Sequence, residues 1–504
     1  MKAKRKIPRK LKLALCIMAA IIFAAGFVLS LYTVSVQFAP LTLSINLSET
    51  YQEMDGFGAS GCWTFQEIGK DEQAAKNAAQ LLYGDDGMKL NILRYNIGAG
   101  SVETDHGYEE DTRPTESFFI SENYKSKESF SDPANYDFTR DKNAMRVLDE
   151  CLKTGNIKTV TLFANSPHYL LTKNGKAHSD TKHTDNLPEE NFEAFSDYLL
   201  IIADFFRQKF SSLENPPKIY ISPVNEPQWS WGGKTVVQEG CHYEPKTLAK
   251  FLDVFYRKLQ AYNKEHGAEI APDFFDCGGY TDKSKYKKYI SEMKKYPYFD
   301  ELESLSFHSY EGKNKRLGRK IFSSYSDKKL KGKAYRMSEF CEMRLGTSFK
   351  IERGLHTAGV IMKDLTILSA TEWSWWLGAS HYGFEDGLIY YEPENLAEFT
   401  CTKRYYCMAQ FSRYISAGDL RVMVTKTDFL NFDGTESCAF LKPDGSVVLV
   451  IINERSVARN LKLGGFTVEN MIYTDAKNNL KEIKPDGNVK ISAKSVTTLI
   501  LKKA

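Results

Sequence analysis

Two glutamates, each following a short apolar stretch, are the residues of this chain best suited to acid–base chemistry. Glu226 lies in Asn225-Glu226-Pro227 directly after KIYISPV, and Glu339 lies directly after AYRMS. Two carboxyl groups about 5–5.5 Å apart hydrolyse a glycosidic bond with retention, one as acid/base and the other as nucleophile. We therefore predict that Glu226 is the acid/base and Glu339 the nucleophile of a retaining glycosidase. For either glutamate alone, a solvated loop position is the alternative.

Four further polar residues are candidates to support this pair. The Asn225 amide could bind a sugar hydroxyl, typically the 2-OH. Arg94 and Tyr310 could donate hydrogen bonds that keep the nucleophile ionised, and an arginine would also lower its pKa. The alternatives are an ion pair at the mouth of the fold for Arg94 and a packing role for Tyr310. His308 is more typical of a hydrogen-bonded core histidine than of a catalytic one.

Tryptophans near the expected strand ends are candidate platforms for sugar rings. Trp63, Trp229 and Trp231 follow predicted strands, and Trp373 and Trp375 lie within one. Alternate residues of a strand share a face, so Trp373 and Trp375 face the same way. If that face points inward, we expect one of them to pack the interior and the upper one to meet substrate. A large aromatic core is the alternative use of the 13% aromatic residues.

The elements that must position these residues alternate between strand-like and helix-like segments from residue 56 to residue 376. Helical periodicity is clearest at 192–210 and 247–262. Eight strand–helix repeats predict an α/β fold, a (β/α)₈ TIM barrel, whose strand ends carry the reacting groups. A doubly wound open sheet is less favoured because no G-x-G-x-x-G loop follows the first strand. The expected strands are Gly56–Ser60, Asn91–Ile97, Thr159–Ala164, Ile219–Val224, Phe274–Gly278, Ser304–His308, Ala334–Ser338 and Thr371–Trp375.

The C-terminal part of the chain changes to short apolar runs between turn signals. The run Ser446–Ile452 directly follows one Pro-Asp-Gly triplet, at 443–445, and a second triplet at 485–487 precedes the run Val496–Leu501. Such triplets between apolar runs are typical of antiparallel strands. We therefore predict a catalytic barrel at 56–405 and an appended antiparallel β-sandwich at 406–504, to which residues 41–55 contribute strands.

Residues 1–35 have the pattern of a signal anchor or a signal peptide. A basic flank precedes Leu13–Leu31, an uncharged apolar stretch of 19 residues. This length lies between that of a signal-peptide core, about 7–15 residues, and that of a spanning helix, about 20. We favour an uncleaved signal anchor, with the basic flank inside and the catalytic part secreted or at the cell surface, tethered to the membrane.

The charge and cysteine distributions exclude several classes of partner. The net charge is +3, although residues 1–12 alone contain seven Lys and Arg, so the body is slightly acidic and a nucleic-acid partner is not expected. The nine cysteines and nine histidines are scattered, without a CxxC pair or zinc-site spacing. We expect no metal and no other cofactor. Most cysteines should be buried free thiols, with one or two disulfides left open.

An ordered set of motifs resembles glycoside hydrolase family 30 from about residue 52 to the C-terminus. The resemblance implies a (β/α)₈ barrel fused to a β-sandwich, retention of configuration and no metal, with Glu226 as acid/base and Glu339 as nucleophile. The matching motifs are Asp55-Gly56-Phe57-Gly58-Ala59-Ser60, Leu93-Arg94-Tyr95-Asn96-Ile97-Gly98, Ser222-Pro223-Val224-Asn225-Glu226-Pro227-Gln228-Trp229, Ser338-Glu339 and Trp373-Ser374-Trp375.

One part of the pattern is similar to endo-β-1,6-galactanases of that family. The similarity rests on Gln238-Glu239-Gly240-Cys241 together with Tyr95-Asn96-Ile97-Gly98. It implies a β-1,6-galactan or another β-linked hexose chain as substrate, and a substrate-binding or supporting role for Glu239. A β-xylanase or a glucosylceramidase-like enzyme with the same machinery is one alternative. A non-catalytic surface protein that binds carbohydrate is another.

Overall fold

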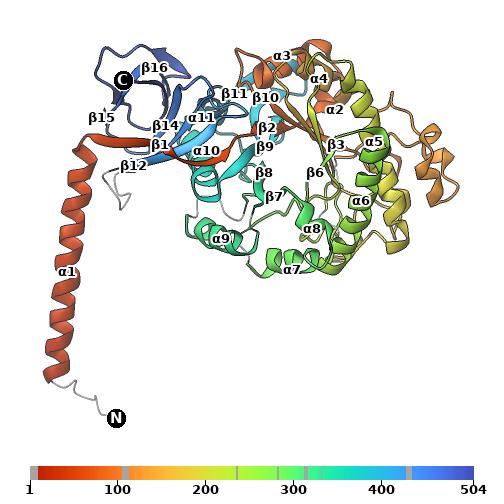
Figure 1. Ribbon diagram of the computed structural model, residues 1–504, viewed down its shortest axis with the longest axis horizontal. Helices are drawn as coiled ribbons and strands as arrows, with labels where there is room; N and C mark the ends of the chain where they lie inside the picture. The colour runs from red at the N-terminus through yellow and green to blue at the C-terminus, as the bar shows by residue number, and fades with distance from the viewer. Residues whose placement is uncertain are drawn as a thin grey trace.

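The chain forms a long N-terminal helix, a ring of strands surrounded by helices, and a second strand-rich part (Figure 1). The computed structural model describes residues 9–104, 113–233, 236–280, 283–310, 316–330, 332–426 and 434–504. The C-terminus lies in the second strand-rich part, beside the point where the N-terminal helix joins the body.

Eight strand segments form a closed ring of parallel pairs. Each except the fifth pairs with the next along the chain, and the last pairs with the first. Between the fifth and sixth segments the link is a bridge from Cys277 to Phe307. These strands are β2 (Gly56–Ser60), β3 (Ile92–Ile97), β4 (Thr159–Ala164), β5 (Lys218–Ser222), β6 (Ala271–Pro272), β7 (Ser304–His308), β8 (Ala334–Phe340) and β9 (Ala370–Ser380).

The fifth strand differs from the prediction of Phe274–Gly278. The regular strand β6 comes earlier and has only two residues, and Phe274–Gly278 is irregular apart from the bridge at Cys277. The reason is local, because Asp276 has φ of 50°, a left-handed conformation that a regular strand cannot contain. This irregular segment brings Asp276 into the centre of the ring, where it contacts functional residues.

Helices cover the outside of the ring (Figure 1). α6 begins at Pro245, which needs no amide partner in the first turn, and it stops before Gly267, whose φ of 57° ends it. The apolar faces of α5 and α6 meet at Phe195 and Phe251, whose rings stack with centroids 5.3 Å apart. The helices are α2 (Thr64–Ile68), α3 (Glu72–Tyr83), α4 (Lys142–Lys153), α5 (Phe192–Ser211), α6 (Pro245–His266), α7 (Lys283–Met293), α8 (Tyr298–Glu301), α9 (Arg316–Lys329), α10 (Ile351–Lys363) and α11 (Lys403–Ser412).

The second strand-rich part is a nine-stranded sheet that includes a strand from the N-terminal side of the ring. β1 (Leu41–Glu53) pairs antiparallel with β12 and parallel with β15, so the sheet is mixed and the prediction of a purely antiparallel one is wrong. β1 enters the sheet from far away in sequence, which leaves its direction free of any hairpin constraint. The order is β17-β16-β19-β14-β13-β12-β1-β15-β18.

Alternation of apolar residues builds the core of this sheet. Leu41 and Leu43 of β1 are buried in the same apolar cluster as Leu449 and Ile451 of β14. The remaining strands are β10 (Gly387–Glu392) and β11 (Asn395–Cys401), which extend the ring sheet, and β12 (Leu420–Lys426), β13 (Thr435–Leu441), β14 (Val447–Asn453), β15 (Arg459–Leu463), β16 (Phe466–Thr474), β17 (Lys481–Ile483), β18 (Lys490–Ile491) and β19 (Ser495–Lys503).

Helix α11 connects the two parts of the body. Its Gln410 side chain donates to Thr474 Oγ1 at 3.0 Å, and Thr498 Oγ1 donates to the Gln410 carbonyl at 2.6 Å. It also packs on α10, which belongs to the outer layer of the ring. The junction at residues 405–406 therefore lies inside a helix that packs on both parts.

The N-terminal helix α1 (Arg9–Phe38) projects away from the body (Figure 1). Its segment Leu15–Tyr32 has a mean hydropathy of 2.4, and none of it is buried against the protein. By length and composition this helix could cross a membrane. Only Ala39 and Pro40 separate it from β1, and the Arg459 guanidinium donates to the Ala39 carbonyl at 2.8 Å.

All nine cysteines are free of disulfides. Seven are buried, Cys401 is half-buried, and Cys16 is exposed on α1. The open question about disulfide pairing is therefore answered in favour of free thiols.

Candidate active site

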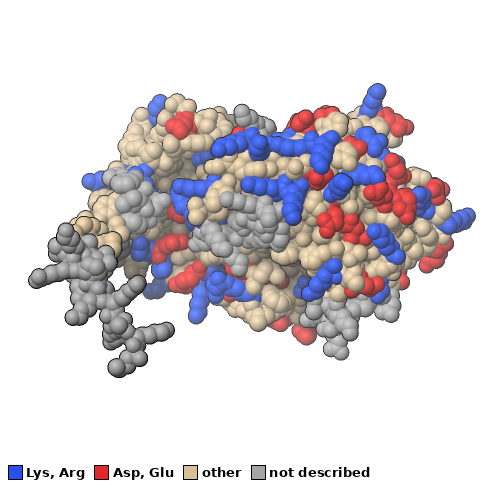
Figure 2. All heavy atoms as spheres, turned by 90° about the horizontal axis from the view of Figure 1, so that it is seen from below, with Lys and Arg blue, Asp and Glu red and all other residues tan. Residues whose placement is uncertain are grey.

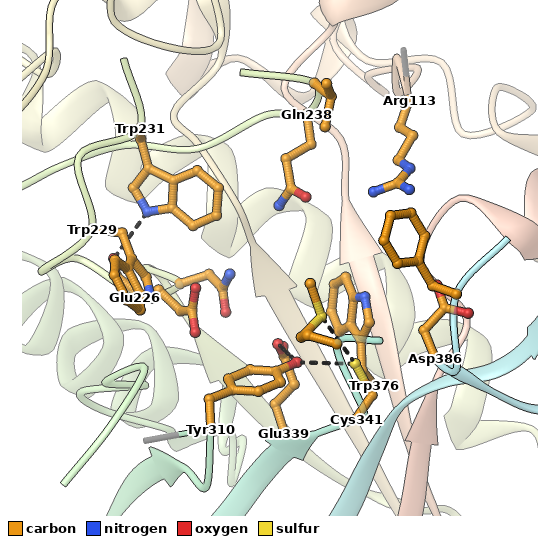
Figure 3. A pocket seen from close by; sticks show the side chains of 14 residues that line it. Arg113, Glu226, Trp229, Trp231, Gln238, Tyr310, Glu339, Cys341, Trp376 and Asp386 are labelled. Carbon is orange, nitrogen blue, oxygen red and sulfur yellow. Dashed lines mark hydrogen bonds between the residues drawn. The ribbon is translucent and has the colours of Figure 1, made fainter. Parts of the chain in front are cut away.

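A cavity of about 560 Å³ contains both predicted carboxyl groups (Figure 3). Glu226 and Glu339 lie at one side of it, and Arg113 and Asp386 lie at the other. The cavity is lined by Arg113, Asn225, Glu226, Trp229, Trp231, Val237, Gln238, Tyr310, Glu339, Cys341, Met343, Trp376, Phe384 and Asp386.

Glu226 is held by its backbone at the turn that follows β5. It has φ of 45°, its amide donates to the Asp276 carbonyl at 2.9 Å, and its own carbonyl accepts from Trp231 Nε1 at 2.9 Å. Gly278 makes room for the side chain, because a Cβ there would lie 2.6 Å from Glu226 Oε1. Burial raises the pKa of Glu226 above its ordinary value, although the hydrogen bond from His308 opposes that rise.

Glu339, the second-to-last residue of strand β8, has both carboxylate oxygens hydrogen-bonded. Arg94 Nη1 donates to Oε2 at 2.7 Å, and the Tyr310 hydroxyl donates to Oε1 at 2.8 Å. The two residues that the sequence singled out as donors therefore both contact this glutamate. One of the two donors carries a permanent positive charge, so Glu339 also forms an ion pair with Arg94.

The two glutamates lie close together. One carboxylate oxygen of Glu226, one of Glu339 and one ring nitrogen of His308 all lie within 4.8 Å of one another. Three such groups could in principle hold a metal ion. However, His308 uses both ring nitrogens for carboxylates, at 2.9 Å from Glu226 Oε1 and 2.9 Å from Asp276 Oδ1.

His308 carries a positive charge between these carboxylates. Burial alone would lower the pKa of His308, but the charges of Glu339 and Asp276 raise it to about 10. A protonated imidazole donates from both nitrogens and keeps no lone pair for a metal. The cluster is thus better suited to organising charge than to binding an ion. His308 is fully buried and hydrogen-bonded as expected, but it contacts the predicted acid/base directly.

Asp276 is a functional residue that the sequence reasoning missed. Its carboxylate accepts from Arg94 Nη2 at 2.9 Å, from His308 and from the Ser338 hydroxyl. Burial disfavours its charge, yet the Arg94 and His308 charges hold the pKa of Asp276 well below its usual range. Asp276 therefore holds in place Arg94 and His308, the two cations that contact the glutamates. An aspartate inside the otherwise apolar segment Phe274–Gly278 was the available signal.

The tryptophans that line the cavity are not all those that were predicted to bind substrate. Trp229 and Trp231 line the cavity, but Trp373 and Trp375 are 0% exposed and are not among its lining residues. Trp373 Nε1 donates to Asp364 Oδ2 at 3.0 Å in the outer layer, so this face of β9 points away from the ring interior. The expectation that one of the pair meets substrate is wrong.

An irregularity in β9 explains which tryptophan reaches the cavity. The register with β2 jumps from Ala59–Trp375 to Ser60–Leu377, which leaves Trp376 as an extra residue. Trp376 lines the cavity. Trp63 supports it from the side, with ring centroids 5.2 Å apart. A bulge of this kind changes the facing of the residues that follow it.

Glu239 lies behind the cavity rather than in it. It is buried and accepts from the Ala99 amide at 3.0 Å and from the Ser101 hydroxyl at 2.6 Å. Burial raises the pKa of Glu239 to about 7. Its role is to hold the loop after β3.

The far side of the cavity carries charged residues that no sequence motif indicated. Arg113 stacks over Tyr382 at 4.2 Å and over Trp63 at 4.7 Å. Asp386 is 5% exposed, and within the described residues its Oδ1 has no hydrogen-bond partner. Burial raises the pKa of Asp386 to about 6. Asn225, beside Glu226, also has an unpartnered buried Oδ1 among the described residues.

Comparison with known proteins agrees with this arrangement. The chain matches the family model for O-glycosyl hydrolase family 30 at residues 40–273 and 338–390, and the family 30 β-sandwich domain at 420–499. An endo-β-1,6-galactanase of Hypocrea rufa is 24% identical over 410 residues, 77% of each chain.

Two solved structures share the fold across most of the chain. A conserved exported protein from Bacteroides fragilis has a TM-score of 0.77 and 22% identity, covering 91% of this chain and 100% of that one. The catalytic domain of a family 30 xylanase C from Talaromyces cellulolyticus has a TM-score of 0.69 and 18% identity, with coverage of 92% and 100%. The predicted resemblance is confirmed, and this chain belongs to glycoside hydrolase family 30 and is a glycosidase with a catalytic part and a β-sandwich domain.

Proposed function

We propose that this protein cleaves β-linked galactan with retention, through a covalent glycosyl intermediate on Glu339. The observation that carries the proposal is the separation of the two glutamates, whose nearest oxygens lie within 4.8 Å. Retaining enzymes have carboxyl groups about 5–5.5 Å apart, whereas inverting enzymes need about 6.5–9.5 Å for a water molecule between them.

The surroundings of each glutamate suit its proposed role. Glu339 accepts hydrogen bonds from Arg94 and Tyr310, which fix the orientation of the carboxylate proposed as nucleophile. Burial raises the pKa of Glu226, which favours the protonated acid. In the first step a Glu339 oxygen bonds to the anomeric carbon while the glycosidic bond breaks, and Glu226 gives its proton to the leaving oxygen.

The second step reverses the role of Glu226. Its carboxylate takes a proton from water, the water oxygen bonds to the anomeric carbon, and the ester to Glu339 breaks. The hydrogen bond from positively charged His308 stabilises the carboxylate form of Glu226 between the two steps. Asn225, whose Oδ1 faces no protein donor among the described residues, is placed to accept a hydrogen bond from a sugar hydroxyl.

The substrate proposal rests on the galactanase relative and on the sequence similarity around Glu239. Asp386 and Arg113, across the cavity from the glutamates, add two polar side chains that could bind hydroxyl groups of the sugar chain. A β-xylan is the second candidate, favoured by the likeness to a family 30 xylanase fold.

We also propose the arrangement of the whole chain. Residues 56–405 form a (β/α)₈ barrel, 406–504 together with 41–55 form the sandwich, and residues 1–35 are a signal anchor. The hydropathy of α1 and the likeness to an exported protein support a catalytic part that lies outside the cell.

The test is hydrolysis of a panel of β-glycans by the detergent-solubilised full chain. Release of β-1,6-linked galactose oligomers that disappears in Glu339→Ala supports the proposal, and release from xylan alone would replace the substrate. Glu226→Gln should lose most activity on substrates with poor leaving groups and much less on activated aryl glycosides. Equal loss on both would contradict its acid role, and no release from any β-glycan would favour a binding protein.

A further inference from the structure

One segment of the chain is far more basic than the rest. Residues 283–333 contain fifteen Lys and Arg against six Asp and Glu, a net charge of +9, whereas the whole chain nets +3. The segment includes α7, α8 and α9. Because the remainder of the body is acidic, this concentration is a local feature rather than a property of the whole surface.

The basic segment forms a face on the side toward which α1 projects. Helices α7, α8 and α9 lie along the lower edge of the body in Figure 1, and α1 extends in that direction. Figure 2 shows this side directly, with Lys and Arg side chains gathered over its middle. We call it the basic face and define it by its exposed cations Lys287, Lys288, Lys294, Lys295, Arg316, Lys320, Lys328 and Lys329.

Few of these charges are neutralised by the protein itself. Lys295 pairs with Glu292 and Arg316 lies 3.7 Å from Glu436. Four of the lysines have no ion-pair partner among the residues that the structure describes, namely Lys287, Lys288, Lys320 and Lys328. Charged residues on a solvated surface usually include both signs. A face whose cations lack neighbouring anions therefore indicates an anionic partner.

A short link joins α1 to the body. α1 ends at Phe38 and β1 begins at Leu41, so the three Cα–Cα steps between them span at most about 10 Å. Arg459 holds the Ala39 carbonyl and shortens the free link further. The short link keeps the body close to the end of α1, and attraction between a basic surface and anionic headgroups acts within about 10 Å at 0.1 M salt.

We propose that the basic face docks on the phosphate-bearing headgroups of an anionic membrane, with α1 as the anchor in the same bilayer. Each lysine near such a surface strengthens binding to the anionic membrane about fivefold. Docking would hold the catalytic part in one orientation against the membrane instead of letting it swing on its link. The proposal uses α1 as a membrane segment and is independent of the substrate.

The experiment places the full-length chain in vesicles of phosphatidylcholine alone or of phosphatidylcholine with phosphatidylglycerol. Flotation reports insertion, and acylation of lysines by an amine-reactive reagent, read by mass spectrometry, reports docking. We expect acylation of Lys287, Lys288, Lys320 and Lys328 to fall about fivefold when phosphatidylglycerol is present. Salt at about 1 M, where screening acts within about 3 Å, should remove the difference.

Exposed lysines on the opposite side of the body provide the internal control. Lys70, Lys76, Lys142 and Lys153 lie at or next to α3 and α4, at the upper edge of Figure 1, and should react equally in both lipids. A variant with glutamine at Lys287, Lys288, Lys320 and Lys328 should lose the protection of the remaining face lysines, whereas glutamine at the four control positions should not.

The outcomes separate the possibilities. Flotation in both lipids with equal lysine reactivity would overturn docking while leaving the anchor intact, and flotation in neither would overturn both. Flotation only with phosphatidylglycerol would support the basic face acting without the anchor. Unchanged hydrolysis of a small soluble glycoside by both variants would show that they are folded, because none of these lysines contacts the cavity.

Discussion

Replacing His308 with glutamine should shift the pH dependence of hydrolysis upward. The imidazole is charged, because its neighbouring carboxylates raise the pKa of His308 to about 10, and it donates to Glu226 at 2.9 Å. A hydrogen bond from a charged donor contributes about 1.5–3 kcal/mol. It stabilises only the ionised form of Glu226, so its loss should raise the pKa of that carboxyl by about one to two units.

The assay is the pH profile of kcat/KM on a substrate with a poor leaving group. Its alkaline limb reports loss of the proton that the general acid must carry, as an apparent pKa of the interacting pair. In His308→Gln this limb should move to higher pH by about one to two units. His168→Gln is the matched control, because burial lowers the pKa of His168 to about 3 and its replacement removes no charge.

The reasoning would be refuted by an alkaline limb that stays in place or moves to lower pH in a folded His308→Gln protein. Either result would mean that the charge of His308 does not stabilise the carboxylate of Glu226. A shift of equal size in His168→Gln would point to a general loss of stability instead.

Four further substitutions test the support around the cavity. Arg94→Met removes the arginine partner of two buried carboxylates and should lower the free energy of unfolding by about 3–5 kcal/mol, and an unchanged urea midpoint would contradict the ion-pair assignment. Trp229→Ala should lower kcat/KM about tenfold with little loss of stability, whereas the fully buried Trp375→Ala should cost about 3–5 kcal/mol. Equal stability losses for both would refute that division. Burial raises the pKa of Glu239 from 4.5 to about 7, so the folded protein binds its proton more tightly, and stability falls as pH rises through that interval. The melting temperatures measured below and above this pH interval should therefore differ less in Glu239→Gln than in the parent protein. The same pH dependence of the melting temperature in both proteins would exclude the effect.

The principal glutamates could be proposed from sequence because their signal is local. A buried strand that ends in a polar residue needs only neighbouring residues to be recognised, as at Glu226 and Glu339. The donors Arg94 and Tyr310 were chosen by the same reasoning, and both contact Glu339. Asp276 escaped because its function depends on a left-handed backbone in an irregular segment, which strand periodicity does not describe.

Local pattern determined the order of strands and helices, the family and the two carboxylates, because apolar periodicity and short motifs are properties of adjacent residues. Tertiary structure alone decided which tryptophans reach the cavity. Strand alternation predicts that Trp373 and Trp375 share a face. Only the packing of β9 decides that this face points outward, and only the bulge in β9 turns Trp376 inward. The basic run at 283–333 is visible in the sequence, yet its position on the side of α1 follows only from the closed ring. Contacts between residues far apart along the chain depend on how the layers pack, and no local pattern contains that information.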